Sequence, residues 1–220
     1  IHFSSGCLLN SKDENDLLNE EATSQPVSYY SWTKLWAENL IQSCKSKQFK
    51  YLILRLRNPY SSLVHHNNLL VKMLTFSKFI DSPNSGVILD DLVEWILILI
   101  QKDAVGIFNT VNSGFTTPFE IALQLKSYII PDLEITKISK SDLDNIQTEK
   151  RTDTLLDNSK LAALVGPVRP LKEGVEKMIK ELSNNIKVGN RNIVREELGK
   201  VYLQSKTRTV VNDSFKSLLD

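Results

Sequence analysis

The chain has 220 residues, of which 41% are hydrophobic and 24% charged, as in an ordinary globular protein that can bury a core. The formal net charge is +1 and no basic block stands out, so the sequence offers no argument for binding nucleic acid or an anionic membrane surface. The longest apolar run, at residues 95–100, is far too short to span a bilayer.

The secondary structure is expected to alternate between strand and helix. In chain order, the expected elements are strand 1–4, loop 6–27, helix 28–41, strand 51–57, helix 67–77, strand 87–89, helix 90–101, strand 106–111, helix 117–128, strand 135–138, and helices 158–164 and 171–182. The expected capping residues are Ser28, Asp90 with Asp91, Thr116 or Thr117 followed by Pro118 and Glu120, and Asp157. Strands that alternate with helices predict right-handed crossovers and a largely parallel sheet, so the fold class is α/β.

The two ends of the chain differ in character from its middle. The chain begins with Ile1 rather than Met, inside an expected strand, so either the amino terminus was removed or the sequence is a fragment. Residues 188–220 are charged, with an amphipathic patch around Leu198 and Val201 that favours a helix over a mobile tail. The two cysteines, Cys7 and Cys44, form no disulfide framework or zinc pattern, and no signal peptide is recognised, which favours a reducing, cytoplasmic compartment.

The most informative pair of residues is Tyr30 and Lys34, four positions apart in an expected helix and so one turn from each other on one face. A nearby cation favours the phenolate of a tyrosine, which lets the phenol exchange a proton with a carbonyl or alcohol oxygen. The spacing alone also fits an ordinary surface pair. What favours a site is the preceding strand, which ends in Ser4-Ser5-Gly6-Cys7.

This ordered set, followed by a strand that ends in Arg55-Leu56-Arg57-Asn58-Pro59, resembles the extended short-chain dehydrogenase/reductase superfamily. Within it, the sequence is most similar to the nucleotide-rhamnose synthases, which are 3,5-epimerase/4-reductases, and more distantly to dTDP-4-dehydrorhamnose reductase. The resemblance covers about residues 1–185 and rests on the order and spacing of the segments 54–62, 68–72, 80–85, 87–90, 106–109 and 151–161.

The resemblance implies a Rossmann-like parallel sheet with a small C-terminal substrate-binding lobe. Members of the family carry a Gly-rich loop that holds the dinucleotide pyrophosphate, but the eight glycines of this sequence are scattered. We therefore expect residues 1–187 to be the C-terminal two thirds of such a domain, N-terminally truncated, and residues 188–220 to be a charged tail.

The resemblance also implies the roles of the site residues in a reduction by NADPH or NADH. Tyr30 would protonate the oxygen at C4 of a nucleotide-linked 4-keto-6-deoxyhexose, Lys34 would assist it and hold the nicotinamide ribose, and Ser5 would donate a hydrogen bond to the same oxygen. Strand alternation and the motif alignment favour Ser5 over Ser4. For both serines, a strand-end hydroxyl bonded to nearby backbone is the simpler alternative.

Epimerisation at C3 and C5 needs one group to remove a proton beside the ketone and another to return one on the opposite face, and a thiol with a lysine can serve. The family's epimerase residues match Cys7 and Lys72. Taken singly, a cysteine is more often a small buried hydrophobe and a lysine a solvated helix residue.

Further binding residues follow from the same resemblance. Asn58 and Pro59 lie where the superfamily contacts the nicotinamide, and Ser61, Asn68 and Arg151 lie where it contacts the substrate. A turn forced by Asn-Pro and a solvated loop arginine are the alternatives, and Lys150 replaces a proline that family members often carry before the arginine. His65 and His66 are interpreted as surface or capping residues, and no metal ion is expected.

The leading hypothesis is therefore an enzyme that makes a nucleotide-linked L-rhamnose from a nucleotide-sugar substrate. A non-catalytic binding or regulatory subunit of the same fold, or an inactive fragment, are the alternatives. A homodimer is a candidate assembly, and the sequence does not distinguish a UDP from a dTDP sugar.

Overall fold

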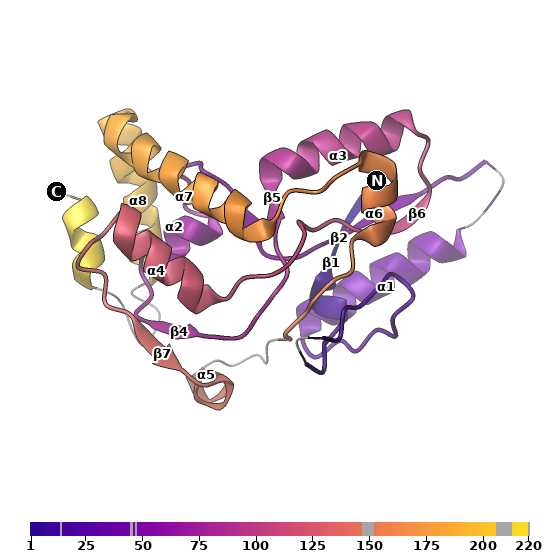
Figure 1. Ribbon diagram of the computed structural model, residues 1–220, viewed down its shortest axis with the longest axis horizontal. Coiled ribbons are helices and arrows are strands. Elements are labelled where there is room, and N and C mark those ends of the chain that lie inside the picture. The colour runs from indigo at the N-terminus through magenta and orange to yellow at the C-terminus, as the bar shows by residue number, and fades with distance from the viewer. Residues whose placement is uncertain (14, 45, 47, 147–151, 206–212, 220) are drawn as a thin grey trace. The chain divides into compact units, whose positions relative to one another are not determined.

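The computed structural model of the protein describes residues 1–13, 15–44, 46, 48–146, 152–205 and 213–219 (Figure 1). The chain forms two units. The first comprises Ile1–Asn58, Pro83–Phe115 and Gln147–Leu171, and the second comprises Pro59–Ser82, Thr116–Ile146 and Lys172–Asp220.

The first unit contains a three-stranded parallel sheet in the order β1-β2-β6, formed by β1 (His2–Ser5), β2 (Leu52–Leu56) and β6 (Gly106–Asn109). Helix α1 (Tyr29–Ser43) connects β1 to β2, and α3 (Leu89–Gln101) precedes β6. Because the strands are parallel, their carboxyl ends lie at one edge of the sheet, where α/β proteins bind their ligands. The parallel α/β fold predicted from the sequence is confirmed.

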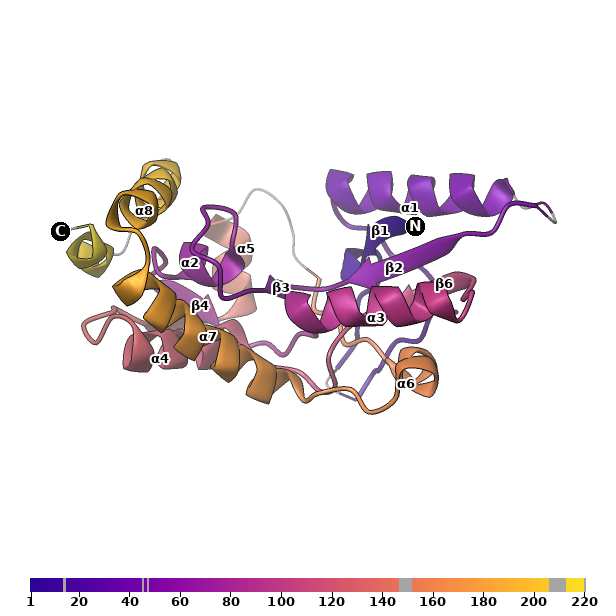
Figure 2. The same ribbon diagram turned by 90° about the horizontal axis from the view of Figure 1, so that it is seen from above.

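Helices cover both faces of this sheet. Helix α1 lies on one side, and α3 and α6 (Ser159–Val165) lie on the other (Figure 2). Alternate residues of β2 serve the two sides: Leu54 belongs to the cluster with α3, whereas Arg55 contacts Glu38 of α1. The buried cluster on the α3 side consists of Leu52, Leu54, Val87, Leu92, Trp95, Leu99, Phe108 and Leu161.

Helix α1 begins where the sequence predicts, but none of its apolar residues is fully buried. Ser28 caps it in a reciprocal capping box with Ser31. The buried residues of α1 are Ser31 and Glu38, whereas Trp32 and Trp36 are 43% and 56% exposed. Leu35 packs against the buried cluster of Leu8, Leu9, Val111 and Leu156. The apolar periodicity therefore locates the helix but does not by itself identify its buried face.

The expected loop 6–27 begins with a 3-10 turn, η1 (Gly6–Leu8), and is tied down by later chain. The backbone amide of Leu18 donates to the carbonyl of Leu155, and that of Asp157 donates back to the carbonyl of Leu18. These hydrogen bonds hold the loop beside the segment that precedes α6.

The second unit contains a small parallel pair, β4 (Lys78–Ile80) with β7 (Thr136–Ile138), and α4 (Pro118–Tyr128) packs against β4. Helix α8 (Arg191–Ser205) contacts α2 (Leu69–Met73) and the 3-10 segment η2 (Asp213–Leu218). The remaining elements of the chain are β3 (Pro59–Tyr60), β5 (Val87–Ile88), α5 (Lys140–Ile146) and α7 (Leu171–Val188). Among the described residues, no helix is both long enough and apolar enough to cross a membrane.

Several local expectations are confirmed and others are wrong. Thr117 caps α4 in a capping box with Glu120, as predicted. Asp90 and Asp91 do not cap α3: its N-cap is Ile88, without a side-chain hydrogen bond, and Asp91 instead accepts 2.7 Å from the amide of Asn112.

Helix α2 is shorter than expected, and β4 was not expected at all. The amides of Thr75 and Phe76 bond to carbonyls three residues earlier, and the Ser77 carbonyl then accepts from the Thr136 amide as the chain enters β4. Helix α5 was likewise not expected, and α7 runs six residues beyond the predicted end at 182, to Val188.

Candidate active site

Tyr30 and Lys34 lie in the first two turns of α1, beside the carboxyl end of β1. The Lys34 Nζ atom lies 5.7 Å from the centroid of the Tyr30 ring and donates a 2.9 Å hydrogen bond to the backbone carbonyl of Phe3. The two side chains therefore share one helix face, as the spacing predicts, and the lysine joins that face to β1. Tyr30 is 49% exposed, so its phenol is accessible.

The two serines at the end of β1 have different partners. The Ser4 hydroxyl donates a 2.5 Å hydrogen bond to the buried carboxylate of Glu38. The Ser5 hydroxyl oxygen accepts 3.2 Å from the Cys7 amide, which leaves its proton for another acceptor. Of the two, Ser5 is the serine whose proton is not already donated to a buried carboxylate, and its contact with a substrate oxygen stays a prediction. The Ser5–Cys7 contact is also the local backbone bond named as the simpler alternative.

Cys7 lies in η1, directly after β1, with its sulfur against a buried arginine. Arg57 follows β2 and is 9% exposed, and one of its terminal nitrogens lies 2.6 Å from the Cys7 Sγ atom. Gly6, directly before Cys7, packs against the Leu156 side chain, because a Cβ atom at Gly6 would lie 2.9 Å from the Leu156 Cδ1 atom. The sequence alone gives Arg57 no role; the signal that points to it is an arginine placed directly after a buried strand.

Asn58 occupies a strained turn at the end of β2. Its φ is +38°, a conformation that asparagine tolerates better than most residues, and its side-chain amide donates 3.1 Å to the carbonyl of Ser85. Pro59 follows as the first residue of β3 and is exposed. The geometry thus supports the simpler alternative, a turn at Asn58-Pro59. Contact of these residues with a nicotinamide stays a prediction.

The predicted substrate residues Ser61 and Asn68 lie in the second unit. The Asn68 side chain caps α2 by accepting from the Leu70 amide and donates 2.8 Å and 2.7 Å to the carbonyls of Ser61 and Leu63. Asn68 therefore has a structural role that the sequence does not indicate, and its substrate contact stays a prediction. Arg151 lies outside the described residues.

Lys72 lies on α2 in the second unit, whereas Cys7 lies in the first. Lys72 is half-buried, and within the described part of the chain its ammonium contacts the side-chain oxygen of Asn67 alone, at 3.4 Å. A weak, long contact of this kind leaves the amine available for other chemistry.

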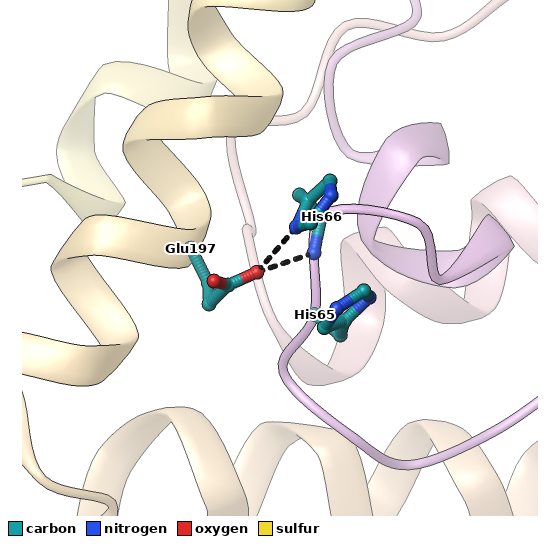
Figure 3. A group of neighbouring side chains, drawn as sticks. All are labelled: His65, His66 and Glu197. Carbon is teal, nitrogen blue, oxygen red and sulfur yellow. Dashed lines mark hydrogen bonds and ion pairs between the residues drawn. The ribbon is translucent and has the colours of Figure 1, made fainter.

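His65, His66 and Glu197 form a cluster in the second unit whose donor atoms lie within 4.8 Å of one another (Figure 3). The Glu197 Oε2 atom accepts from the His66 amide at 2.8 Å and lies 2.7 Å from the His66 Nδ1 atom. Its other oxygen accepts 2.7 Å from Lys200, and His65 Nδ1 accepts from the Asn67 amide. These hydrogen bonds occupy the carboxylate and one nitrogen of each ring, and the Lys200 ammonium beside the carboxylate would repel a metal cation. The cluster is therefore better explained as a set of hydrogen bonds that joins the loop of His65 and His66 to α8.

The pKa of Glu197 predicts how the stability contributed by these hydrogen bonds depends on pH. Hydrogen bonds from Lys200, the His66 amide and the His66 ring lower the pKa of Glu197 from 4.5 to about 2. A carboxyl group with a lower pKa in the folded state contributes stability that is complete above the unfolded pKa and is lost as the pH falls through the folded one. The contribution is therefore expected in full above about pH 4.5 and to disappear toward pH 2.

Thermal unfolding of the parent and of Glu197→Gln over that pH range measures this effect. The difference in melting temperature should be largest near neutral pH and shrink as the pH falls. Glu196→Gln is the matched control, because the Glu196 side chain is on the same helix, contacts the same lysine and is 67% exposed. A difference for Glu197→Gln that does not change with pH would contradict the assignment.

Comparison with known proteins supports the resemblance proposed from the sequence. Residues 1–95 match the model of the NAD dependent epimerase/dehydratase family. A bifunctional dTDP-4-dehydrorhamnose 3,5-epimerase/dTDP-4-dehydrorhamnose reductase of Arabidopsis thaliana is 26% identical over 195 residues, which are 86% of this chain and 64% of that protein. The similarity to rhamnose-synthesis enzymes is thereby confirmed.

Solved structures confirm the fold. A UDP-rhamnose synthase from Acanthamoeba polyphaga mimivirus superposes with a TM-score of 0.72 at 23% identity, covering 82% of this chain and 65% of that one. A dTDP-4-dehydrorhamnose reductase from Bacillus anthracis, in complex with NADP, gives a TM-score of 0.67 at 19% identity, covering 82% and 64%. The chain thus spans less than two thirds of the length of these proteins.

Proposed function

We propose that this chain carries the catalytic residues of a 3,5-epimerase/4-reductase that converts a nucleotide-linked 4-keto-6-deoxyhexose into a nucleotide-linked L-rhamnose. The observation that carries the proposal is the group at the carboxyl end of β1. Ser5 ends the strand, Cys7 lies in the turn directly after it, and Lys34 donates a hydrogen bond to the Phe3 carbonyl of the same strand. The names of the similar proteins, which couple a 3,5-epimerase to a reductase, support it.

In the reductive half, Tyr30 donates its proton to the C4 oxygen, which gains negative charge as the carbonyl carbon is reduced. Lys34 stabilises the phenolate that remains, and the Ser5 hydroxyl donates a hydrogen bond to the same C4 oxygen. A nicotinamide cofactor, when bound, supplies the hydride; an accessible phenol with an ammonium 5.7 Å from its ring suits the ribose and nicotinamide end of such a group. The choice between NADPH and NADH stays a prediction, as do the roles of Asn58 and Pro59.

In the epimerising half, a base removes the proton at C3 or C5, which are acidic because they flank the C4 ketone. The electron pair moves to the C4 oxygen as an enolate, and a proton then returns to the carbon on the opposite face. Cys7 and Lys72 are assigned to these two proton transfers. This half is redox-neutral, so it does not consume a hydride.

Because the two halves differ in this way, they can be tested separately on this chain. The chain is incubated in D₂O with UDP- or dTDP-4-keto-6-deoxyglucose, first alone and then with NADPH. Deuterium at C3 and C5, followed by NMR, reports epimerisation, and loss of the reduced nicotinamide absorbance reports reduction. A folded chain, checked by circular dichroism, that gives neither deuterium incorporation nor cofactor oxidation would contradict the proposal.

The same experiment addresses the alternative of a non-catalytic binding or regulatory subunit. That role predicts a folded chain without either reaction but with a partner that co-purifies in a fixed ratio. The division into residues 1–187 and a tail at 188–220, the cytoplasmic location and a homodimeric assembly stay predictions.

A further inference from the structure

Arg57 is a buried cation of the first unit. Its guanidinium donates 3.1 Å and 2.7 Å to the side-chain oxygen of Asn84, 2.5 Å to the backbone carbonyl of Thr152, and 2.6 Å to the Cys7 sulfur. Among the residues that the structure describes, none of these acceptors is a carboxylate. Asp153 accepts a hydrogen bond of 3.3 Å from the side-chain amide of Asn84.

A buried cation without an anion beside it is costly, whereas charge-assisted hydrogen bonds to an anion are about twice as strong as neutral ones. Of the three groups that Arg57 contacts, an amide oxygen and a carbonyl oxygen cannot take a negative charge, but a sulfur can. The planar guanidinium fork is held at its other nitrogens by Asn84 and Thr152, so the nitrogen that faces Cys7 is fixed in direction.

We propose that Arg57 is a positioning residue that holds the Cys7 sulfur as an anion at the end of β1, ready to take up a proton. Asn84 and Thr152 serve as the fixed support of the guanidinium. This inference rests on the proposed function for the reason why the sulfur must accept a proton, but the state of the sulfur can be measured without any sugar substrate.

The experiment uses the full 220-residue chain with Cys44→Ser, so that Cys7 is its only thiol. The alkylation rate with iodoacetamide, in which the sulfur bonds to carbon and iodide leaves, is measured at one neutral pH in the parent, Arg57→Ala and Arg57→Lys. The ultraviolet absorbance of the thiolate is recorded at the same pH. Arg169→Gln is the matched control, since it removes a cation of the same unit that pairs with Asp91 and not with Cys7.

Arg57→Ala is expected to slow alkylation roughly tenfold or more and to remove the thiolate absorbance, because one charge-assisted hydrogen bond is lost. Methylguanidinium at a non-denaturing concentration should restore part of the alkylation rate and part of the thiolate absorbance of Arg57→Ala. Such a rescue is not expected if Arg57 has a purely structural role. Arg57→Lys keeps the positive charge but loses the planar guanidinium. Its alkylation rate and thiolate absorbance should lie between those of the parent and those of Arg57→Ala, and it replaces Arg57→Ala in the test if that variant does not fold. A parent-like rate and absorbance in either folded variant would overturn the inference.

The sugar assay then separates this inference from the proposed function. If alkylation depends on Arg57 but the parent exchanges no deuterium into the sugar, the proposed function fails and the Arg57–Cys7 assignment stands. If the parent exchanges deuterium and alkylation is indifferent to Arg57, the proposed function stands and this inference fails.

Discussion

Replacing Cys7 by alanine is expected to abolish the exchange of the C3 and C5 protons while hydride transfer to an already epimerised 4-keto sugar continues. The alanine side chain can neither accept nor return a proton, and a positioned acid or base typically contributes about 10²–10⁴-fold to the rate of a step. Reduction draws its proton from Tyr30, which lies on α1 and not in the turn that holds Cys7. Among the described residues, no hydrogen bond joins Tyr30 to Cys7.

The reciprocal variant makes this prediction sharper. Tyr30→Phe keeps the ring beside Lys34 but removes the proton donor, so reduction should fall by a similar factor while deuterium still enters C3 and C5. Cys44→Ala, at the exposed end of α1, is the control for loss of a thiol as such. Equal loss of both steps in Cys7→Ala would remove the cysteine from its assigned role.

The sequence locates these side chains because their signals are local. Ser28, Tyr30 and Lys34 lie within seven positions of one another, so a helix with a capping serine fixes which face they share. Thr117, Pro118 and Glu120 likewise predict where α4 begins. Short-range patterns of this kind depend little on the rest of the chain.

Arg57 could not be assigned a partner from the sequence, because its acceptors come from distant segments. Cys7 is 50 positions before it and Thr152 is 95 positions after it, and nothing in the sequence specifies that they meet. Strand β4 was missed for a related reason. Three residues are too few to show a periodicity, and the strand exists because it pairs with β7.

Glu38 shows where periodicity misleads. A charged residue in a helix beside two tryptophans predicts a solvated position, yet Glu38 is 1% exposed and the tryptophans face outward. Its carboxylate accepts 3.0 Å and 2.8 Å from the guanidinium of Arg55, which is itself 4% exposed, and 2.5 Å from the Ser4 hydroxyl. Glu38, one turn from Lys34, therefore joins the buried face of α1 to β2 by an ion pair and to β1 by a hydrogen bond.

Removing either partner of this pair is expected to be the most damaging single change to the stability of the first unit. Glu38→Leu leaves the Arg55 guanidinium buried without its carboxylate. Arg55→Met leaves the Glu38 carboxylate buried with the Ser4 hydroxyl as its one remaining hydrogen-bond donor among the described residues. Breaking a buried pair from one side typically lowers the free energy of unfolding by about 3–5 kcal/mol. Urea unfolding of each variant, followed by circular dichroism, measures the loss.

The double variant Glu38→Leu/Arg55→Met should be clearly more stable than the sum of the two losses predicts, because no charge is then left unpaired and apolar side chains can fill the space. Asp103→Asn is the matched control in the same unit. It breaks the Lys50–Asp103 pair, whose side chains are 59% and 72% exposed, keeps a residue that tolerates the positive φ there, and should cost less than about 1 kcal/mol. Strictly additive losses in the double variant would mean that Glu38 and Arg55 stabilise the unit independently. The packing of α1 against the sheet, which places Lys34 beside β1, would then depend on other contacts.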